Sequence, residues 1–142
     1  MNIVYLSLGT NLGDKEKNLK DALSQIQRRI GTIKAKSAFI ETQPWGFESD
    51  NNFLNAAVKV ETILEPMTLL DECQLIEKTM GRAKKSVNGV YKDRIIDIDI
   101  LMYYKDGDIS GDGIHINTPR LTIPHPLMNE RDFVLIPLKQ IL

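Results

Sequence analysis

The sequence predicts an α+β fold of the ferredoxin-like class, in which an antiparallel sheet carries two helices in the order β-α-β-β-α-β. Three observations lead to this fold class. Four apolar stretches have the two-residue alternation or the doubly apolar pattern of strands, and two stretches between them have apolar residues at helical spacing. The order of the stretches places both helices on one face of the sheet. The other face must then be covered by loops, by the C-terminal tail or by a ligand.

The first half of the chain supplies a strand, a helix and a second strand. Residues 3–9 are apolar in both alternating rows, which is typical of a central strand that is covered on both faces. Asp14 is a suitable N-cap for a helix whose apolar residues recur up to Ile30, and Gly31 is expected as its C′ residue. Residues 32–41 alternate and are expected to form one strand.

The second half repeats this order and adds a tail. Residues 53–63 alternate as a third strand, and Pro66 opens a second helix that Gly81 ends. Residues 94–104 form the last predicted strand of the sheet. The apolar tail, residues 133–142, is expected to form a short helix that lies on the core.

Three connecting stretches read as loops. Residues 42–52 are rich in Pro, Gly and Asn, and residues 82–93 are polar and basic without a regular pattern. The pairs Asp106-Gly107 and Asp112-Gly113 mark turns, so a small hairpin is expected near them.

Length and composition limit the classes of protein. The chain has 142 residues, of which 42% are hydrophobic, so we expect a single domain over residues 1–142. Its net charge of −1 argues against a general polyanion binder. Cys73, the single cysteine, is expected to be a core thiol, and its isolation fits a reducing compartment. The N-terminus lacks a signal-peptide pattern and no apolar run is long enough to span a bilayer, so we expect a cytoplasmic protein.

The stretch Arg94–Leu101 contains the most informative pair of residues. In a strand, Asp97 and Asp99 point to one face while Ile96, Ile98, Ile100 and Met102 point to the other. The Cα atoms of the two aspartates would lie about 6.6 Å apart. Two carboxylates in an apolar strand repel each other and lose solvation, and a hard divalent cation removes both penalties. We therefore predict a magnesium site; an aspartate pair on a solvated face is the alternative.

A basic stretch precedes this strand. Arg82, Lys84, Lys85, Lys92 and Arg94 are opposed only by Asp93. A charge run by itself is usually a solvated loop. Beside two carboxylates that hold a metal ion, however, such cations would stabilise charge on transferring phosphates.

A second group of residues suits a flat heterocycle. Phe53 and Asn55 lie on one face of a strand, and Trp45, Phe47 and Phe133 are aromatic residues near loops or strand ends. An amide beside aromatic walls can read the hydrogen-bonding edge of a sandwiched ring. For each aromatic residue alone, ordinary core packing is the alternative. His125, between two prolines, is expected to donate a hydrogen bond to an anion or to brace its loop.

Taken together, the motifs resemble those of the 6-hydroxymethyl-7,8-dihydropterin pyrophosphokinase family of folate biosynthesis. Six segments match in order and at fitting spacing: LGTNLGD at 8–14, ETQPWG at 41–46, FLNAA at 53–57, Glu77 with Gly81-Arg82, RIIDIDIL at 94–101, and LTIPHP at 121–126 with Arg131 and FVL at 133–135.

The resemblance implies a reaction and a role for each matching residue. The family transfers the terminal diphosphate of ATP to the hydroxymethyl group of the pterin and releases AMP. By resemblance, two Mg²⁺ ions would be held by Asp97 and Asp99, and phosphate charge would be neutralised by Arg82 and Arg94. The residues implied for ATP are Gln74, Glu77, Lys84, Ile100, Arg120, Leu121, Thr122, His125 and Arg131. Those implied for the pterin are Thr42, Pro44, Trp45, Phe53, Asn55, Tyr91 and Phe133. Residues 82–94 would form a lid over both substrates.

Two other classes of function stay open. One is a homologue that binds nucleotide and pterin without catalysis. The other is a ferredoxin-fold module for RNA, which would be expected to carry an aromatic RNP1-like motif that this sequence lacks. We expect small-molecule substrates, no nucleic-acid or membrane partner, and a monomer.

Overall fold

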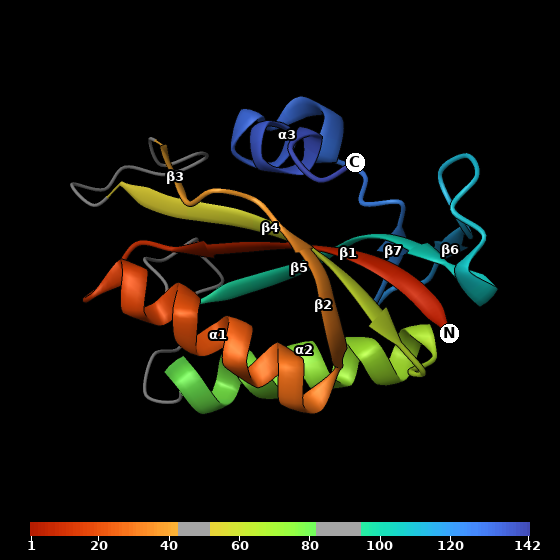
Figure 1. Cartoon of the computed structure of the whole chain (residues 1–142), viewed down its shortest axis with the longest axis horizontal. Helices are drawn as coiled ribbons and strands as arrows, with labels where there is room; N and C mark the ends of the chain where they lie inside the picture. Colours follow the sequence, from red (N-terminus) through yellow and green to blue (C-terminus); the bar gives the residue numbers. More distant parts are fainter. Residues whose placement is uncertain (43–51, 82–94) are drawn as a thin grey trace.

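The computed structural model describes residues 1–42, 52–81 and 95–142, and its elements follow the predicted order (Figure 1). The main sheet contains β1 (Asn2–Thr10), β2 (Gly31–Lys36), β3 (Ile40–Thr42), β4 (Phe53–Thr62) and β5 (Asp97–Tyr104). The helices are α1 (Lys15–Arg29), α2 (Pro66–Gly81) and α3 (Asp132–Lys139). Two short strands, β6 (Ile116–Asn117) and β7 (Thr122–Ile123), pair with each other, and η1 (Lys105–Gly107) and η2 (Met128–Glu130) are single turns of 3₁₀ helix.

The sheet confirms the predicted fold class. Its strand order is β2-β4-β1-β5, every neighbouring pair is antiparallel, and β3 pairs with β4. Helices α1 and α2 lie on one face, as expected, and α3 lies on the other (Figure 1). The central strand β1 is therefore covered on both faces, which explains why both of its rows are apolar.

The single strand predicted over residues 32–41 is two strands, β2 and β3. They are separated at Ser37, whose backbone N–H donates to the carbonyl of Ala57 at 2.9 Å. Its hydroxyl oxygen accepts from the backbone N–H of Ala57, also at 2.9 Å. Because a side chain takes the place of a backbone acceptor here, the ladder with β4 is interrupted and the chain bends.

The start of α1 is as predicted, and its end is not. The Asp14 side chain accepts a hydrogen bond from the backbone N–H of Lys17 at 3.1 Å and caps the helix. Gly31, however, is the first residue of β2 rather than a left-handed C′ residue. Crowding explains why this position is a glycine, because a Cβ there would lie 2.0 Å from the carbonyl oxygen of Glu61.

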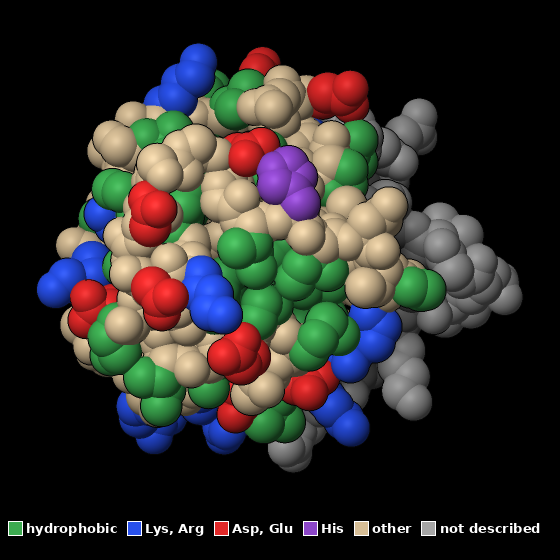
Figure 2. Space-filling view, turned by 90° about the vertical axis from the view of Figure 1, so that its right-hand side faces the viewer, with side chains coloured by type: hydrophobic (Ala, Val, Ile, Leu, Met, Phe, Trp, Pro, Cys, Tyr) green, Lys and Arg blue, Asp and Glu red, His purple; other side chains and the backbone are tan. Residues whose placement is uncertain are grey.

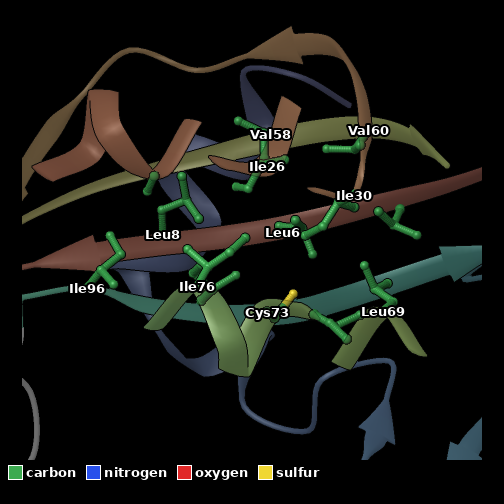
Figure 3. Packing of buried hydrophobic residues seen from close by; sticks show 14 of the residues in the cluster. Leu6, Leu8, Ile26, Ile30, Val58, Val60, Leu69, Cys73, Ile76 and Ile96 are labelled. Atoms are coloured by element: carbon green, nitrogen blue, oxygen red, sulfur yellow. The ribbon is translucent and has the colours of Figure 1, made fainter. Parts of the chain in front are cut away.

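The main core lies between the sheet and the pair α1 and α2 (Figure 3). The strands contribute the residues of one row, among them Leu6, Leu8 and Val58. Cys73 is fully buried among them, and burial raises the pKa of its thiol, so the prediction of a core thiol is confirmed.

The tail covers part of the second face of the sheet. The helix predicted over residues 133–142 is α3, and its Val134 and Leu138 belong to the same buried cluster as Tyr5 and Tyr104. At the end of α3, the Gln140 side chain accepts a hydrogen bond from the backbone N–H of Ala38 at 2.8 Å. The helix is thereby fixed to the bend between β2 and β3.

An irregularity in β5 changes which side chains share a face. The register with β1 shifts between the pairs Tyr5↔Met102 and Leu6↔Ile100, so Leu101 is an extra residue. Ile96, Ile98 and Ile100 belong to the main core, as predicted. Met102 packs on the opposite face with Leu101, and its predicted place beside the isoleucines is wrong.

The remaining differences lie around β5. The strand begins at Asp97 rather than at residue 94, and the predicted turns at 106–113 do not form a hairpin of their own. The hairpin lies later, where Ile116 pairs with Ile123. None of the helices in the described ranges has the length and apolar character that crossing a membrane requires.

Truncation of α3 tests its role as the cover of the second face. Leu138 is 2% exposed, so Leu138→Ala should lower the free energy of unfolding by about 2–4 kcal/mol because it leaves a cavity. Leu142, which is 70% exposed, is the control, and Leu142→Ala should change the same quantity by less than about 0.5 kcal/mol in urea titrations. Equal effects of the two substitutions would contradict this role for α3.

Candidate active site

Two rows of residues cross three adjacent strands on the face opposite α1 and α2. In one row, Gly9 of β1 lies between Asn55 of β4 and Asp97 of β5. In the next, Ser7 lies between Ala57 and Asp99. Directly paired residues place their side chains on the same face, and neighbouring strands lie about 4.8 Å apart. Asn55 and Asp97 are therefore separated by about 10 Å, with only a glycine between them.

The acidic end of these rows includes a third carboxyl group. Glu77 of α2 accepts a hydrogen bond from the backbone N–H of Ile98 at 2.8 Å. Burial is the main cause that raises the pKa of Glu77 to about 8. The neighbouring carboxyl groups of Asp97 and Asp99 raise it further, while the Ile98 hydrogen bond opposes the shift. Burial, together with the negative charge of the neighbouring aspartates, thus favours the protonated form of Glu77 near neutral pH.

The donor set fits Mg²⁺ that binds together with phosphate. Within the described part of the chain, no group of three or more His, Cys, Asp or Glu side chains is placed to enclose a metal ion. Magnesium does not need such a cage, because it is commonly held by one or two carboxylates and keeps its other positions for water and phosphate oxygens. Asp97 and Asp99 supply hard oxygen donors on one face, at a place where negative charge is concentrated.

The amide end of the rows is organised by β3. Asn55 is 2% exposed, and its Nδ2 donates to Thr42 Oγ1 at 2.7 Å and to the Ile40 carbonyl at 3.3 Å. Its Oδ1 lies over Gly9, where a Cβ would be 3.1 Å from that oxygen and 3.5 Å from Phe53 Cδ1. The structure therefore brings Thr42, Phe53 and Asn55 together, and both amide protons of Asn55 are engaged within the protein.

His125 is held beside the acidic end. Its backbone N–H donates to the carbonyl of Leu101 at 2.9 Å, and its Nδ1 accepts from the backbone N–H of Leu127 at 3.2 Å. Burial and then Arg131 lower the pKa of His125, and Asp97 only partly opposes them. The neutral ring therefore carries its proton on Nε2, which leaves Nε2–H as a donor.

Arg131 and Phe133 lie at the start of α3. Arg131 is 7% exposed, and its guanidinium carbon is 5.5 Å from the centre of the Phe133 ring. Because Arg131 contributes to the pKa shift of His125, the two side chains lie in the same part of the molecule.

Three further residues implied for ATP lie at the surface between α2 and the β6–β7 hairpin. Arg120 Nη2 donates to Gln74 Oε1 at 3.1 Å and to Asp71 Oδ1 at 2.7 Å. Thr122, on β7, is half-buried. Asp71 is a contact that the sequence motifs did not indicate.

Two of the implied residues do not present their side chains to this face. Ile100 and Leu121 are buried in the main core with the residues of α1 and α2. Only their backbone could contact a ligand. Six residues that the resemblance implies lie outside the described residues: Pro44, Trp45, Arg82, Lys84, Tyr91 and Arg94. Phe47, Lys85 and Lys92, which the sequence analysis also singled out, lie outside them as well.

The pKa of Glu77 predicts how stability depends on pH in the absence of metal. Its folded value, about 8, lies above the ordinary value of 4.5, so the folded protein holds a proton that the unfolded chain releases between these values. The free energy of unfolding should therefore fall as pH rises through this window. Because the side chain is only half-buried, we expect a fall of about 2 kcal/mol, well below the full shift at 1.36 kcal/mol per pKa unit.

Urea titrations at pH 5 and 8.5 in the presence of EDTA measure this fall. Glu77→Gln removes the titrating group and keeps an acceptor for Ile98, so it should flatten the pH dependence. An unchanged slope in that variant would assign the pH dependence to another group.

Comparison with known proteins identifies the family. Residues 5–142 match the family described as 7,8-dihydro-6-hydroxymethylpterin-pyrophosphokinase, HPPK. A 2-amino-4-hydroxy-6-hydroxymethyldihydropteridine pyrophosphokinase of Porphyromonas gingivalis is 47% identical over 141 residues, which cover 99% of this chain and 91% of that protein. The enzyme of the same name from Bacillus subtilis is 38% identical over 141 residues, or 99% of this chain and 78% of that protein.

Solved structures agree on the fold. An HPPK-DHPS protein in complex with substrates superposes with a TM-score of 0.71 at 19% identity, over 99% of this chain and 40% of that chain. The wild-type Plasmodium falciparum HPPK-DHPS with SDX-DHP gives 0.67 at 18% identity, over 99% and 40%. At these identities the structures support the ferredoxin-like fold alone. The family match and the 47% identical relative show that the chain belongs to the 7,8-dihydro-6-hydroxymethylpterin-pyrophosphokinase family.

Proposed function

We propose that the protein transfers diphosphate from ATP to the hydroxymethyl group of 6-hydroxymethyl-7,8-dihydropterin and releases AMP, in folate biosynthesis. The hydroxymethyl oxygen attacks the β-phosphorus, and the bond from this phosphorus to the oxygen it shares with the α-phosphate breaks. The observation that carries the proposal is the pair of rows on one sheet face, with the Asn55 amide at one end and Asp97 and Asp99 at the other.

Asp97 and Asp99 are the residues that would hold Mg²⁺, and two ions are proposed. When bound, magnesium neutralises phosphate charge and orients the oxygens of the triphosphate. The aspartates would hold the positive charge of the magnesium ions on the same sheet face as the pterin end of the site. Arg82 and Arg94, outside the described residues, are proposed to bind phosphate oxygens of ATP. The segment that carries them, residues 82–94, is proposed to close over the substrates.

The pterin would be read by the Asn55 carbonyl oxygen. Since both Nδ2 protons are bonded to Thr42 and Ile40, Oδ1 is the group left to accept a hydrogen bond from an N–H of the heterocycle. Phe53 lies against the same floor at Gly9 and would contact a face of the ring. Phe133 is proposed to contact the other face, and Pro44, Trp45 and Tyr91 would complete the pocket.

ATP would be bound by residues of α2, β7 and the segment before α3. Gln74 and Arg120 are already hydrogen-bonded to each other, and Thr122 follows on the same hairpin. A neutral His125 would donate Nε2–H to a phosphate oxygen without adding a full charge, and Arg131 beside it would supply one. Lys84, Ile100 and Leu121 complete the proposed ATP set, the last two through their backbone.

The direct test is an assay of AMP. Purified protein with ATP and Mg²⁺ should form AMP only when 6-hydroxymethyl-7,8-dihydropterin is added, as measured by chromatography. If calorimetry shows that both substrates bind but AMP is absent, the protein is instead a non-catalytic homologue.

An RNA-binding module is the less favoured alternative. On the face of the molecule that Figure 2 shows, Lys and Arg side chains are interspersed with Asp and Glu around a group of hydrophobic side chains. An RNA surface would be expected to gather positive charge. We further propose that the protein acts as a monomer in the cytoplasm, because all proposed site residues lie in one chain and its one cysteine is a buried thiol.

Removal of either carboxylate tests the metal site. Asp97→Asn and Asp99→Asn should each lower kcat by at least about 100-fold, since charge stabilisation at the phosphates is lost. Thermal stability without metal should hold or rise, because repulsion among the carboxyl groups is relieved. Asp21→Asn, which removes an exposed aspartate paired with Lys17, is the control and should leave both quantities unchanged. Retention of most activity in either site variant would refute the metal role.

A methyl group at Gly9 tests the floor of the pterin site. In Gly9→Ala the added carbon would crowd Asn55 Oδ1 and the Phe53 ring. We expect the KM for the pterin to rise about tenfold, equivalent to about 1.4 kcal/mol. The KM for ATP should change by less than about twofold, because ATP is proposed to bind away from Asn55. Steady-state kinetics with each substrate varied in turn distinguishes this from equal losses for both, which would contradict the assignment.

A further inference from the structure

We infer that Glu77 is a positioning residue of the metal site, and that it acts as a hydrogen-bond acceptor for the backbone of β5 rather than as a ligand of the nucleotide. This inference rests on the proposed function, because it concerns the strand that carries Asp97 and Asp99. Its evidence is the hydrogen bond from the Ile98 N–H to Glu77 Oε2 at 2.8 Å.

The place of Ile98 in the sequence gives this bond its importance. Ile98 is the residue between Asp97 and Asp99, and its side chain is buried in the main core. A bond to its N–H therefore fixes the peptide unit that joins Asp97 to Ile98, between the two aspartates in the strand. A rotation of this segment would turn both carboxylates together.

The position of the strand makes the bond necessary. Among the strands that the structure describes, β5 is at the edge of the sheet and pairs with β1 alone. The Ile98 N–H, which donates to Glu77, is directed away from β1, so none of the described strands pairs with it. The described structure satisfies two other outward groups of β5 from nearby loops, since the carbonyl of Leu101 accepts from His125 and that of Tyr103 accepts from Ile114. Glu77 does the same at the end of the strand that holds the aspartates.

The helix that carries Glu77 is itself firmly placed. Cys73 and Ile76, on the adjoining face of α2, are fully buried in the main core. Glu77 is thus presented to the edge of β5 from a rigid element. A positioning role needs only an oxygen at this place, whereas a ligand role needs the negative charge.

Two substitutions separate these roles. Glu77→Gln keeps an oxygen at the same reach and removes the group that could ionise. Glu77→Asp keeps an ionisable carboxyl group and withdraws the oxygen by one methylene. Glu72, half-buried on the same helix, offers the matched controls Glu72→Gln and Glu72→Asp.

The first readout is amide exchange at Ile98 in the metal-free protein, measured by NMR. Loss of one hydrogen bond should speed exchange about tenfold in Glu77→Asp, and Glu77→Gln should stay within about threefold of wild type. The second is the Mg²⁺ concentration at half-maximal binding of an ATP analogue with a methylene between its α- and β-phosphorus atoms, measured by calorimetry. It should rise about tenfold in Glu77→Asp and change less than about threefold in Glu77→Gln.

The reverse order, with Glu77→Gln impaired and Glu77→Asp normal, would overturn the inference in favour of a charge or ligand role. Normal values for both variants would overturn it as well, and so would equal defects in the Glu72 variants. Amide exchange needs no substrate, so this test is distinguishable from failure of the proposed function, in which the wild-type protein would form no AMP.

Discussion

The pairing of β1 with β4 on one side and with β5 on the other is the constraint on which the site depends. Asn55 and Asp97 share a face only because both are paired with Gly9. A slip of one residue in either ladder would turn one of them into the helix-covered core. The alternate residues of β1, Leu6 and Leu8, are fully buried, so the hydrophobic core itself enforces the register. Core packing therefore determines the geometry of the polar site.

That register places Asp97 and Asp99 on one face, and Glu77 of α2 lies beside them. The chain has a net charge of −1, yet the pKa of Glu77 is raised to about 8 by burial and by the aspartates beside it. Such an arrangement lowers the free energy of unfolding as long as no cation is bound, and the large apolar core offsets this loss. A site of this kind suits a nucleotide that brings its own metal ions, since the same ions relieve repulsion within the protein and within the triphosphate.

The sequence was sufficient for the parts of the site that depend on alternation along a strand. The two aspartates, and Phe53 with Asn55, follow from a two-residue period that the structure keeps. Features that depend on distant partners could not be predicted. The extra residue at Leu101 moves Met102 to the other face, and the Ser37 hydroxyl divides β2 from β3 through a bond to Ala57. Neither leaves a local pattern, because the deciding contact lies elsewhere in the chain.

The edge of β5 explains how residues from separate segments are held near one another. Glu77 of α2, His125 before η2 and Ile114 before β6 each bond to an outward-facing backbone group of this strand. A free edge would be open to pairing with another chain, so these bonds protect the sheet as well as tie the segments to it. Gln74 lies one turn before Glu77, and Arg120 and Thr122 lie between Ile114 and His125 in the sequence. The residues proposed for the nucleotide are thus held close to the strand that carries the proposed metal ligands, by hydrogen bonds to the backbone of that strand.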